Sequence, residues 1–119
     1  MIIIGAGQVG SSIAADLEDT HEVIVIERDP ARVEELNYSL DVLAIQGDGT
    51  AVATLEEAGV DSAGMVIAST DNDETNIVAC STVKAISDGF TIARIKNTEY
   101  LRTWERSEKA FGIDFMVCT

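Results

Sequence analysis

The chain has 119 residues, the length of one domain, and hydrophobic residues make up 46% of it, which is enough for a buried core. No apolar run in it approaches the ~18 residues that a membrane-spanning helix needs. Its 21 acidic and 8 basic residues give a formal net charge of −13, which excludes nucleic acid as a partner because phosphates would be repelled. These values predict one globular, cytoplasmic domain.

Lysine is scarce in this acidic chain, with only Lys84, Lys96 and Lys109. Repulsion among so many carboxylates opposes a compact state, and molar salt screens it by shortening the Debye length to about 3 Å. The composition therefore favours a protein from a halophile. The alternative is an ordinary acidic cytoplasmic protein.

Apolar segments of strand length alternate with helical patterns along the chain. The predicted strands are Met1–Ile4, Glu22–Ile26, Val42–Ile45, Met65–Ala68, Thr91–Ile95 and Phe115–Val117. The predicted helices are Val9–Leu17, Pro30–Leu40, Ala51–Ala58, Asp73–Ile86 and Glu99–Phe111. Most strands are almost continuously apolar, which is typical of a parallel sheet covered on both faces. We therefore predict an α/β fold of the Rossmann type, a doubly wound sheet of six strands in the order 3-2-1-4-5-6.

Several single residues carry structural signals. Asp29 suits the N-cap of the second predicted helix. Gly59 and Gly112 follow predicted helices, as capping glycines do. Cys80 and Cys118 have no metal-ligand spacing, so we expect both to be small buried hydrophobic residues.

The first predicted strand is followed by Gly5-Ala6-Gly7-Gln8-Val9-Gly10, a G-x-G-x-x-G pattern that opens the first helix. Gly5 permits the tight turn, Gly7 lets a pyrophosphate approach the backbone, and Gly10 lets the helix pack on the strand. Free N–H groups and the helix dipole complete an anion site. This context predicts binding of an adenine dinucleotide, and the alternative is a glycine turn without a ligand.

Glu27 ends the second predicted strand, about 20 residues after the glycine loop. A carboxylate at that place accepts hydrogen bonds from the hydroxyls of the adenosine ribose and repels a 2′-phosphate, so we expect NAD to bind in preference to NADP. Arg28 is next in the chain, and a neighbouring arginine can accommodate that phosphate. The alternative for Glu27 is a solvated charge at a strand end.

Three further segments lie at the same predicted edge of the sheet. Asp48, in Gly47–Thr50, is placed to meet the adenine or ribose, although a simple turn would also explain this loop. The polar segment Ser69–Asn76 lies beside the expected crevice, and helix capping would explain much of it. Arg94 lies within an apolar strand, where a cation needs a partner, either a ligand phosphate or an internal carboxylate.

Taken together, these residues resemble the nucleotide-binding domain of the RCK/KTN family, the regulators of potassium conductance, over nearly the whole chain. Among its members, those that regulate Trk-type potassium uptake systems are most similar. The resemblance rests on segments at Ile4–Gly10, Val25–Asp29, Gln46–Thr50, Asp73–Asn76, Ala93–Ile95 and Glu99–Leu101. The run Asp73–Asn76 together with Ala93–Ile95 is much more specific to this family than the glycine loop is.

The resemblance implies a set of ligand contacts. It assigns the pyrophosphate to Gly5, Ala6, Gly7, Gln8 and Val9, the adenosine ribose to Glu27, the adenine to Asp48 and Gly49, and the distal half of the ligand to Thr70, Asp71 and Arg94. Many members have aspartate where this chain has Glu27. Members also usually add a crossover helix and a small C-terminal domain, so we expect residues 1–119 to be one NAD-binding domain of a longer chain.

The leading hypothesis is a regulatory module and not an enzyme. Binding of NAD(H) would change how several copies assemble and so control a Trk-type potassium-transporting membrane protein, at the cytoplasmic face of the membrane. The alternative is the cofactor domain of a truncated NAD-dependent dehydrogenase, although the sequence has no Tyr-x-x-x-Lys pair and no residues left for a substrate domain. No catalytic residue or metal site is predicted. Whether NAD⁺, NADH, ATP or ADP is the physiological ligand stays open.

Overall fold

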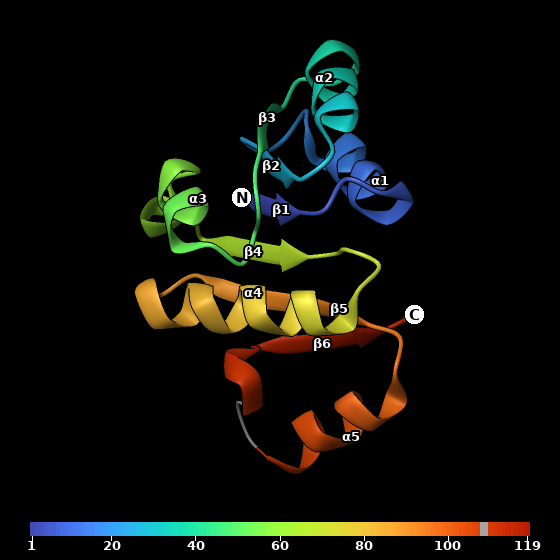
Figure 1. Cartoon of the computed structure of the whole chain (residues 1–119), viewed down its shortest axis with the longest axis vertical. Coiled ribbons are helices and arrows are strands. Elements are labelled where there is room, and N and C mark those ends of the chain that lie inside the picture. Colours follow the sequence, from blue (N-terminus) through green and yellow to red (C-terminus); the bar gives the residue numbers. More distant parts are fainter. Residues whose placement is uncertain (108–109) are drawn as a thin grey trace.

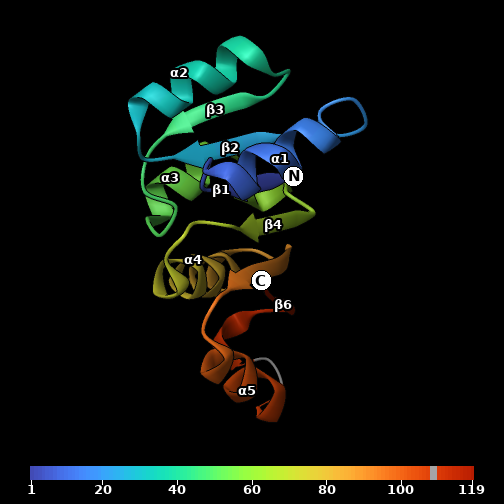
Figure 2. The ribbon, with the colours of Figure 1, turned by 90° about the vertical axis from the view of Figure 1, so that its right-hand side faces the viewer.

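The computed structural model describes residues 1–107 and 110–119. Within these ranges, six strands form one parallel sheet in the order β3-β2-β1-β4-β5-β6, which confirms the predicted doubly wound arrangement. The strands are β1 (Ile2–Ile4), β2 (Ile24–Glu27), β3 (Leu43–Gln46), β4 (Met65–Ala68), β5 (Phe90–Ile95) and β6 (Phe115–Cys118). They succeed one another along the longest axis of the molecule, with β3 toward one end and β6 toward the other (Figure 1, Figure 2).

The helices cover both faces of the sheet. They are α1 (Gln8–Leu17), α2 (Pro30–Ser39), α3 (Val52–Glu57), α4 (Asp73–Ile86) and α5 (Thr98–Arg106). The first two pack on one face, and the other three pack on the opposite face. Right-handed crossovers produce this division, because the chain winds from β1 toward β3 and then from β4 toward β6. No helix in the described ranges is long and apolar enough to cross a membrane.

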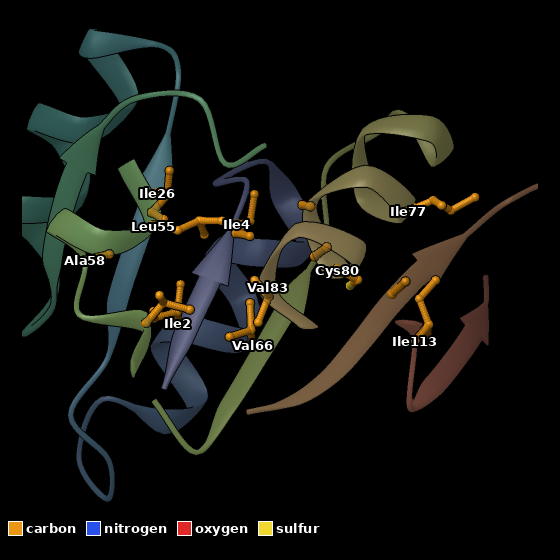
Figure 3. Packing of buried hydrophobic residues seen from close by; sticks show 14 of the residues in the cluster. Ile2, Ile4, Ile26, Leu55, Ala58, Val66, Ile77, Cys80, Val83 and Ile113 are labelled. Atoms are coloured by element: carbon orange, nitrogen blue, oxygen red, sulfur yellow. The ribbon is translucent and has the colours of Figure 1, made fainter. Parts of the chain in front are cut away.

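The first strand lies at the centre of both cores. Ile2 and Ile4 belong to the larger cluster, which the sheet forms with α3, α4 and α5, whereas Ile3 packs with Ala14 of α1 on the opposite face. All three isoleucines are at most 2% exposed, and each such burial contributes roughly 1.5–3 kcal/mol. Figure 3 shows part of the larger cluster, in which Leu55 of α3 and Cys80 of α4 face the sheet. This packing fixes the strand whose carboxyl end carries the glycine loop.

A polar cluster anchors the segment that leads into β6. The carboxylate of Asp114 accepts hydrogen bonds from the ammonium of Lys84 on α4 and from the backbone N–H of Thr91, the latter at 2.9 Å. Lys84 also donates to the carbonyl of Gly89 at 3.0 Å. Burial opposes ionisation of Asp114, but the hydrogen bonds from Lys84 and Thr91 outweigh it and lower the pKa of this carboxyl.

The last helix is shorter than the sequence predicted. α5 ends at Arg106 instead of Phe111, and residues 108 and 109, which the prediction included, lie outside the described residues. Phe111 and Gly112 have φ of 63° and 65° in a separate 3-10 turn, so Gly112 does not cap α5. The indole N–H of Trp104 donates to the carbonyl of Ile113 at 2.8 Å and holds the returning chain against the helix. This long-range contact has no signature in the helical pattern.

The other single-residue predictions have mixed outcomes. The side chain of Asp29 caps α2 by accepting from the N–H of Ala31 at 3.0 Å, and Gly59 follows α3 with φ of 79°, both as predicted. Cys80 is buried, as expected, but Cys118 is exposed. The expectation for Cys118 was wrong because β6 is an edge strand, so its last residue is not covered on every side.

Candidate functional site

A cleft of about 400 Å³ lies at the carboxyl edge of the sheet. All strands are parallel, as the arrowheads of β1 and β4 show in Figure 1, so the loops that follow them meet at this edge although they are far apart in sequence. Ten of the eleven predicted ligand residues line the cleft: Gly5, Gly7, Gln8, Val9, Glu27, Asp48, Gly49, Thr70, Asp71 and Arg94. Its volume is typical of small-molecule sites, which span about 300–1,000 Å³.

Two glycines of the first loop are required by the packing of the protein itself. Gly5 has φ of +95°, which favours glycine, and a Cβ there would lie 2.9 Å from the backbone nitrogen of Thr70. A Cβ on Gly10 would lie only 1.9 Å from the carbonyl oxygen of Gly5. The N–H of Gly5 donates to the carbonyl of Ile26 at 2.8 Å. The loop therefore turns tightly from β1 into α1 while bonded to β2, and α1 packs directly on it.

Gly7 is different, because packing within the chain does not require a glycine at this position. It has an ordinary φ of −70°, and beyond its chain neighbours the nearest described atom to an added Cβ would be Nη1 of Arg32, at 3.9 Å. Gly7 is the N-cap of α1 and offers no side chain to the first helical turn. In the part of the chain that the structure describes, the N–H groups of Gln8 and Val9 donate no hydrogen bond. The space in front of Gly7 thus faces unsatisfied donors at the positive end of a helix.

Glu27 is held rigidly at the end of β2. Its side chain is buried, with the residue 7% exposed, and one carboxylate oxygen accepts from the N–H of Ala6 while the other accepts from the N–H of Asp29, each at 2.7 Å. The carboxylate therefore joins the glycine loop to the start of α2. Each oxygen still has a lone pair that can accept from a ligand hydroxyl.

Ala6 is the one predicted ligand residue that does not line this cleft. Its side chain is 5% exposed and packs in the core under α1 and α2. Its N–H, the group through which it would meet a phosphate, is already donated to Glu27. The sequence could not reveal this arrangement, because the two residues lie 21 positions apart.

The loop after β3 places one carboxylate at the mouth of the cleft. Asp48 accepts from the N–H of Thr50 at 2.9 Å and from its hydroxyl at 2.7 Å. These hydrogen bonds are the main reason that the pKa of Asp48 lies below its ordinary value; burial slightly opposes the shift, and the positive charge of Arg28 adds to it. Gly49 is buried, and a Cβ on it would lie 2.3 Å from Cγ2 of Ile4. The loop must therefore lie directly over the end of β1.

Arg32 is a third arginine of the cleft, besides Arg28 and Arg94, and it was not predicted to contact the ligand. It lies in the first turn of α2, where its Nη1 is 3.9 Å from the carboxylate of Glu27 and its Nε is 3.9 Å from that of Asp29. The side chain is 54% exposed. The available signal was that Arg32 lies four residues after Arg28, at the start of a predicted helix. Only the fold shows that its side chain faces Gly7.

Arg94 lines the distal part of the cleft from β5. It is half-buried, and its Nε donates to the hydroxyl of Thr119 at 3.0 Å. Among the described residues it makes no ion pair, so the internal carboxylate considered as its partner is not found there. Residues of β5 alternate between buried and less buried positions, and Arg94 occupies one of the latter.

Asn76 holds the two distal loops together, a role that the sequence did not predict. It is fully buried on α4, and its amide oxygen accepts from the N–H of Thr70 at 3.0 Å. Its amide nitrogen donates to the carbonyls of Thr70 at 3.1 Å and Arg94 at 2.7 Å. One side chain thus fixes the backbone of two residues of the predicted ligand set. In the sequence, Asn76 is a polar residue just before an apolar run, and this position does not identify its hydrogen-bond partners.

The polar segment before α4 is a helix N-terminus, as considered from the sequence, and its capping residue is Asn72. Its side chain accepts from the N–H of Thr75 at 2.8 Å. Asp73 instead accepts from the N–H groups of Lys96 and Asn97, at 2.9 and 2.8 Å. The loops after β4 and β5 are therefore bonded to each other beside the cleft.

Residues 1–119 match the family model of the TrkA-N domain. The chain belongs to the TrkA-N domain family. It is 36% identical over 118 residues to a Trk system potassium uptake protein TrkA homolog of Archaeoglobus fulgidus, an alignment that covers 99% of this chain and 27% of that protein. It is also 36% identical over 120 residues to the Trk system potassium uptake protein TrkA of Halomonas elongata, with 98% of this chain and 26% of that protein covered. The chain spans about a quarter of the length of these two relatives.

Solved structures share the fold of this TrkA-N domain. The TrkA-N domain of the inner membrane protein ybaL from Escherichia coli has a TM-score of 0.86 at 23% identity, over 98% of this chain and 84% of that one. The GsuK channel bound to NAD has a TM-score of 0.84 at 20% identity, over 98% of this chain and 20% of that one. GsuK bound to ADP has the same score and identity, over 98% and 30% of the two chains. At these identities the likeness supports the Rossmann-type fold.

The cleft of the TrkA-N domain offers two kinds of group to a ligand. Helix α1 and the arginines supply hydrogen-bond donors, which suit anionic oxygens. Glu27 and Asp48 supply acceptors, which suit hydroxyl and amino groups. A molecule with both phosphates and sugar hydroxyls complements this arrangement.

Proposed function

We propose that this TrkA-N domain binds NAD(H) in the cleft at the carboxyl edge of the sheet. The pyrophosphate lies over Gly7 and the first turn of α1, and the adenosine ribose donates its hydroxyls to Glu27. The adenine lies near Asp48 and Gly49. The distal half of the dinucleotide extends toward Thr70, Asp71 and Arg94.

The open space in front of Gly7 carries this proposal. An added Cβ would meet no described atom nearer than 3.9 Å outside its chain neighbours, so packing within the chain gives no reason for glycine there. A pyrophosphate that approaches the backbone does give a reason. The N–H groups of Gln8 and Val9, which have no acceptor among the described residues, line the same cleft. Glu27 lies next to them, with each of its oxygens 2.7 Å from a backbone donor.

We further propose that the domain is regulatory and catalyses no reaction. Its relatives are named Trk system potassium uptake proteins, and GsuK, a channel of which one part shares this fold, has been solved bound to NAD and to ADP. By extension, this domain belongs to a longer cytoplasmic subunit that assembles as a homo-oligomer on a potassium-transporting membrane protein. Regulation requires that two ligand states favour two assembly states to different degrees.

Titration calorimetry of the isolated domain with NAD⁺, NADH, ADP and ATP tests the binding proposal. Saturable binding of NAD⁺ or NADH, with one ligand per chain, is the expected result. Binding of ADP and ATP alone would keep the site but replace the proposed ligand, because all four molecules share the adenosine and its phosphates. If none of them binds at concentrations of about 1 mM, where affinities of about −4 kcal/mol become visible, the proposed function is wrong.

A further inference from the structure

Arg32 lies between the two places that the proposed function assigns to the ribose and to the phosphates. Its Nη1 is 3.9 Å from the Glu27 carboxylate on one side and 3.9 Å from the position of a Cβ on Gly7 on the other. Residues of α2 thus reach over the glycine loop, opposite the N-terminus of α1. No ligand role was predicted for this residue.

The guanidinium of Arg32 is only weakly engaged by the protein. Both of its ion pairs, with Glu27 and Asp29, are at 3.9 Å, which is too long for a hydrogen bond, and the side chain is 54% exposed. Among the described residues it donates no hydrogen bond, although a guanidinium has five N–H donors in a planar fork that matches phosphate oxygens. The oxygens of Glu27 accept instead from the N–H groups of Ala6 and Asp29.

We propose that Arg32 binds the phosphate next to the adenosine ribose in the bound nucleotide, so that this phosphate lies between the guanidinium and the N-terminus of α1. The inference rests on the proposed function and adds a phosphate-recognition residue to it. The ribose hydroxyls are neutral and have Glu27 as their acceptor, whereas the phosphate is the anion that passes closest to Gly7. Arg28 is a poorer candidate, because its charge acts on Asp48, at the adenine side.

The test compares Arg32→Gln with the wild-type chain in titrations of adenosine, ADP, NAD and NADP. Arg32→Gln removes the charge from an exposed side chain, so the fold should survive, and unchanged thermal unfolding verifies this. Arg32→Lys keeps the charge but not the fork. Arg102→Gln is the matched control, because Arg102 is exposed and lies outside the cleft, and its one ion pair among the described residues is with Glu99 on α5.

In the wild type, ADP should bind more tightly than adenosine. Arg32→Gln should weaken ADP and NAD about tenfold and leave adenosine unchanged, Arg32→Lys should weaken them less, and Arg102→Gln should change nothing. An unchanged ratio of ADP to adenosine affinity in Arg32→Gln overturns the inference. So does a loss confined to NADP, which would assign Arg32 to a 2′-phosphate. If the wild type binds no nucleotide, both the proposed function and the inference about Arg32 are wrong. If the wild type binds nucleotides and Arg32→Gln binds them equally well, only the inference about Arg32 is wrong.

Discussion

Gly7 and Gly10 stand three residues apart in the same loop, yet a methyl group would meet very different surroundings at the two positions. At Gly10 it would lie 1.9 Å from the carbonyl oxygen of Gly5, whereas at Gly7 it would meet nothing nearer than Arg32, at 3.9 Å. Gly7→Asp should therefore fold normally but lose nucleotide binding, since a carboxylate would occupy the phosphate position. Gly10→Ala should lose about 1–3 kcal/mol of stability or more, as overpacked sites do. Thermal unfolding and titration with NAD measure the two effects.

The opposite pattern would contradict these assignments. If Gly7→Asp binds NAD with wild-type affinity, no phosphate approaches Gly7. If Gly10→Ala melts at the wild-type temperature, α1 does not need to pack on the loop as closely as the structure indicates.

Glu27 is expected to determine the preference for an unmodified ribose over one with a 2′-phosphate. Its carboxylate is fixed by two backbone N–H groups at 2.7 Å, so it cannot swing away from a 2′-phosphate without leaving those donors unpaired. NAD should therefore bind at least ~10-fold more tightly than NADP, a difference that needs only about 1.4 kcal/mol. Glu27→Gln removes the charge, and because an amide nitrogen cannot accept, it also loses the hydrogen bond from one of these two N–H groups. It should weaken the binding of NAD and narrow the difference in affinity between NAD and NADP.

ADP is the internal control for this prediction, because it carries the unmodified ribose and should follow NAD in both proteins. Equal affinities of the wild type for NAD and NADP, measured by calorimetry, would mean that Arg28 or Arg32 neutralises Glu27. In that case the carboxylate does not select the ribose.

At the scale of elements, Asn76 joins the loop after β4 to the end of β5. It is fully buried, and its amide bonds to backbone groups of Thr70 and Arg94. Asn76→Asp has almost the same shape but only acceptor oxygens when ionised, so the carbonyls of Thr70 and Arg94 lose their donor. We expect a loss of about 2–4 kcal/mol in the free energy of unfolding and a weaker affinity for NAD.

Urea unfolding of Asn76→Asp and Asn76→Ala provides the measurement. The exposed neighbour Asn72→Asp is the matched control, since its carboxylate can still cap α4 by accepting from the N–H of Thr75. Wild-type stability in Asn76→Asp would show that the two loops do not depend on this amide.

The anchor of β6 should make stability depend on pH. The carboxyl of Asp114 has a pKa below the ordinary 3.8, because hydrogen bonds from Lys84 and Thr91 outweigh its burial. Its ionised form therefore contributes stability that is fully present above about pH 4 and is lost as pH falls through the lower pKa of the folded state. Asp114→Asn should cost about 1–2 kcal/mol at pH 7, and this penalty should shrink at more acidic pH.

Asp61→Asn removes the same charge from an exposed position and is the control for the general effect of charge. Chemical unfolding of the three proteins between pH 7 and pH 3 measures the penalty, with pH 3 lying below the ordinary carboxyl pKa. A penalty for Asp114→Asn that stays constant over this range would show that ionisation of Asp114 contributes nothing.

At the scale of the whole molecule, the net charge of −13 should make the domain more stable in molar KCl than in dilute buffer. The ion pairs seen in the described residues engage only Glu27, Asp29, Glu99 and Asp114 among the 21 acidic residues of the chain. Thermal melts across a KCl series measure the effect, and each kcal/mol of stabilisation corresponds to a rise of about 4 °C in a domain of this size.

A variant with Glu56→Lys and Glu57→Lys provides the comparison, because both residues are exposed on α3 and each substitution adds two charges, from −13 to −9. Its melting temperature should rise less steeply with KCl. A wild-type melting temperature that is flat or falls with KCl would contradict adaptation to salt.

The order of the elements and the type of the fold were determined by the sequence itself. Continuous apolar strands, the turn at Gly5–Gly10 and the capping residues Asp29 and Gly59 act over a few neighbouring positions, so their signals are local. Parallel strands and right-handed crossovers then leave few topologies, and the loops of the predicted ligand set must meet at one edge.

The tertiary structure alone decided which groups contact each other at that edge. Glu27 meets Ala6 across 21 positions, Asn76 meets Arg94 across 18, and Arg32 faces Gly7 because α2 packs beside α1. Likewise, the carbonyl of Ile113 accepts from the indole of Trp104 only because the chain after α5 folds back onto that helix. Such contacts depend on how whole helices and strands are placed relative to one another, so the local pattern of residue types does not predict them.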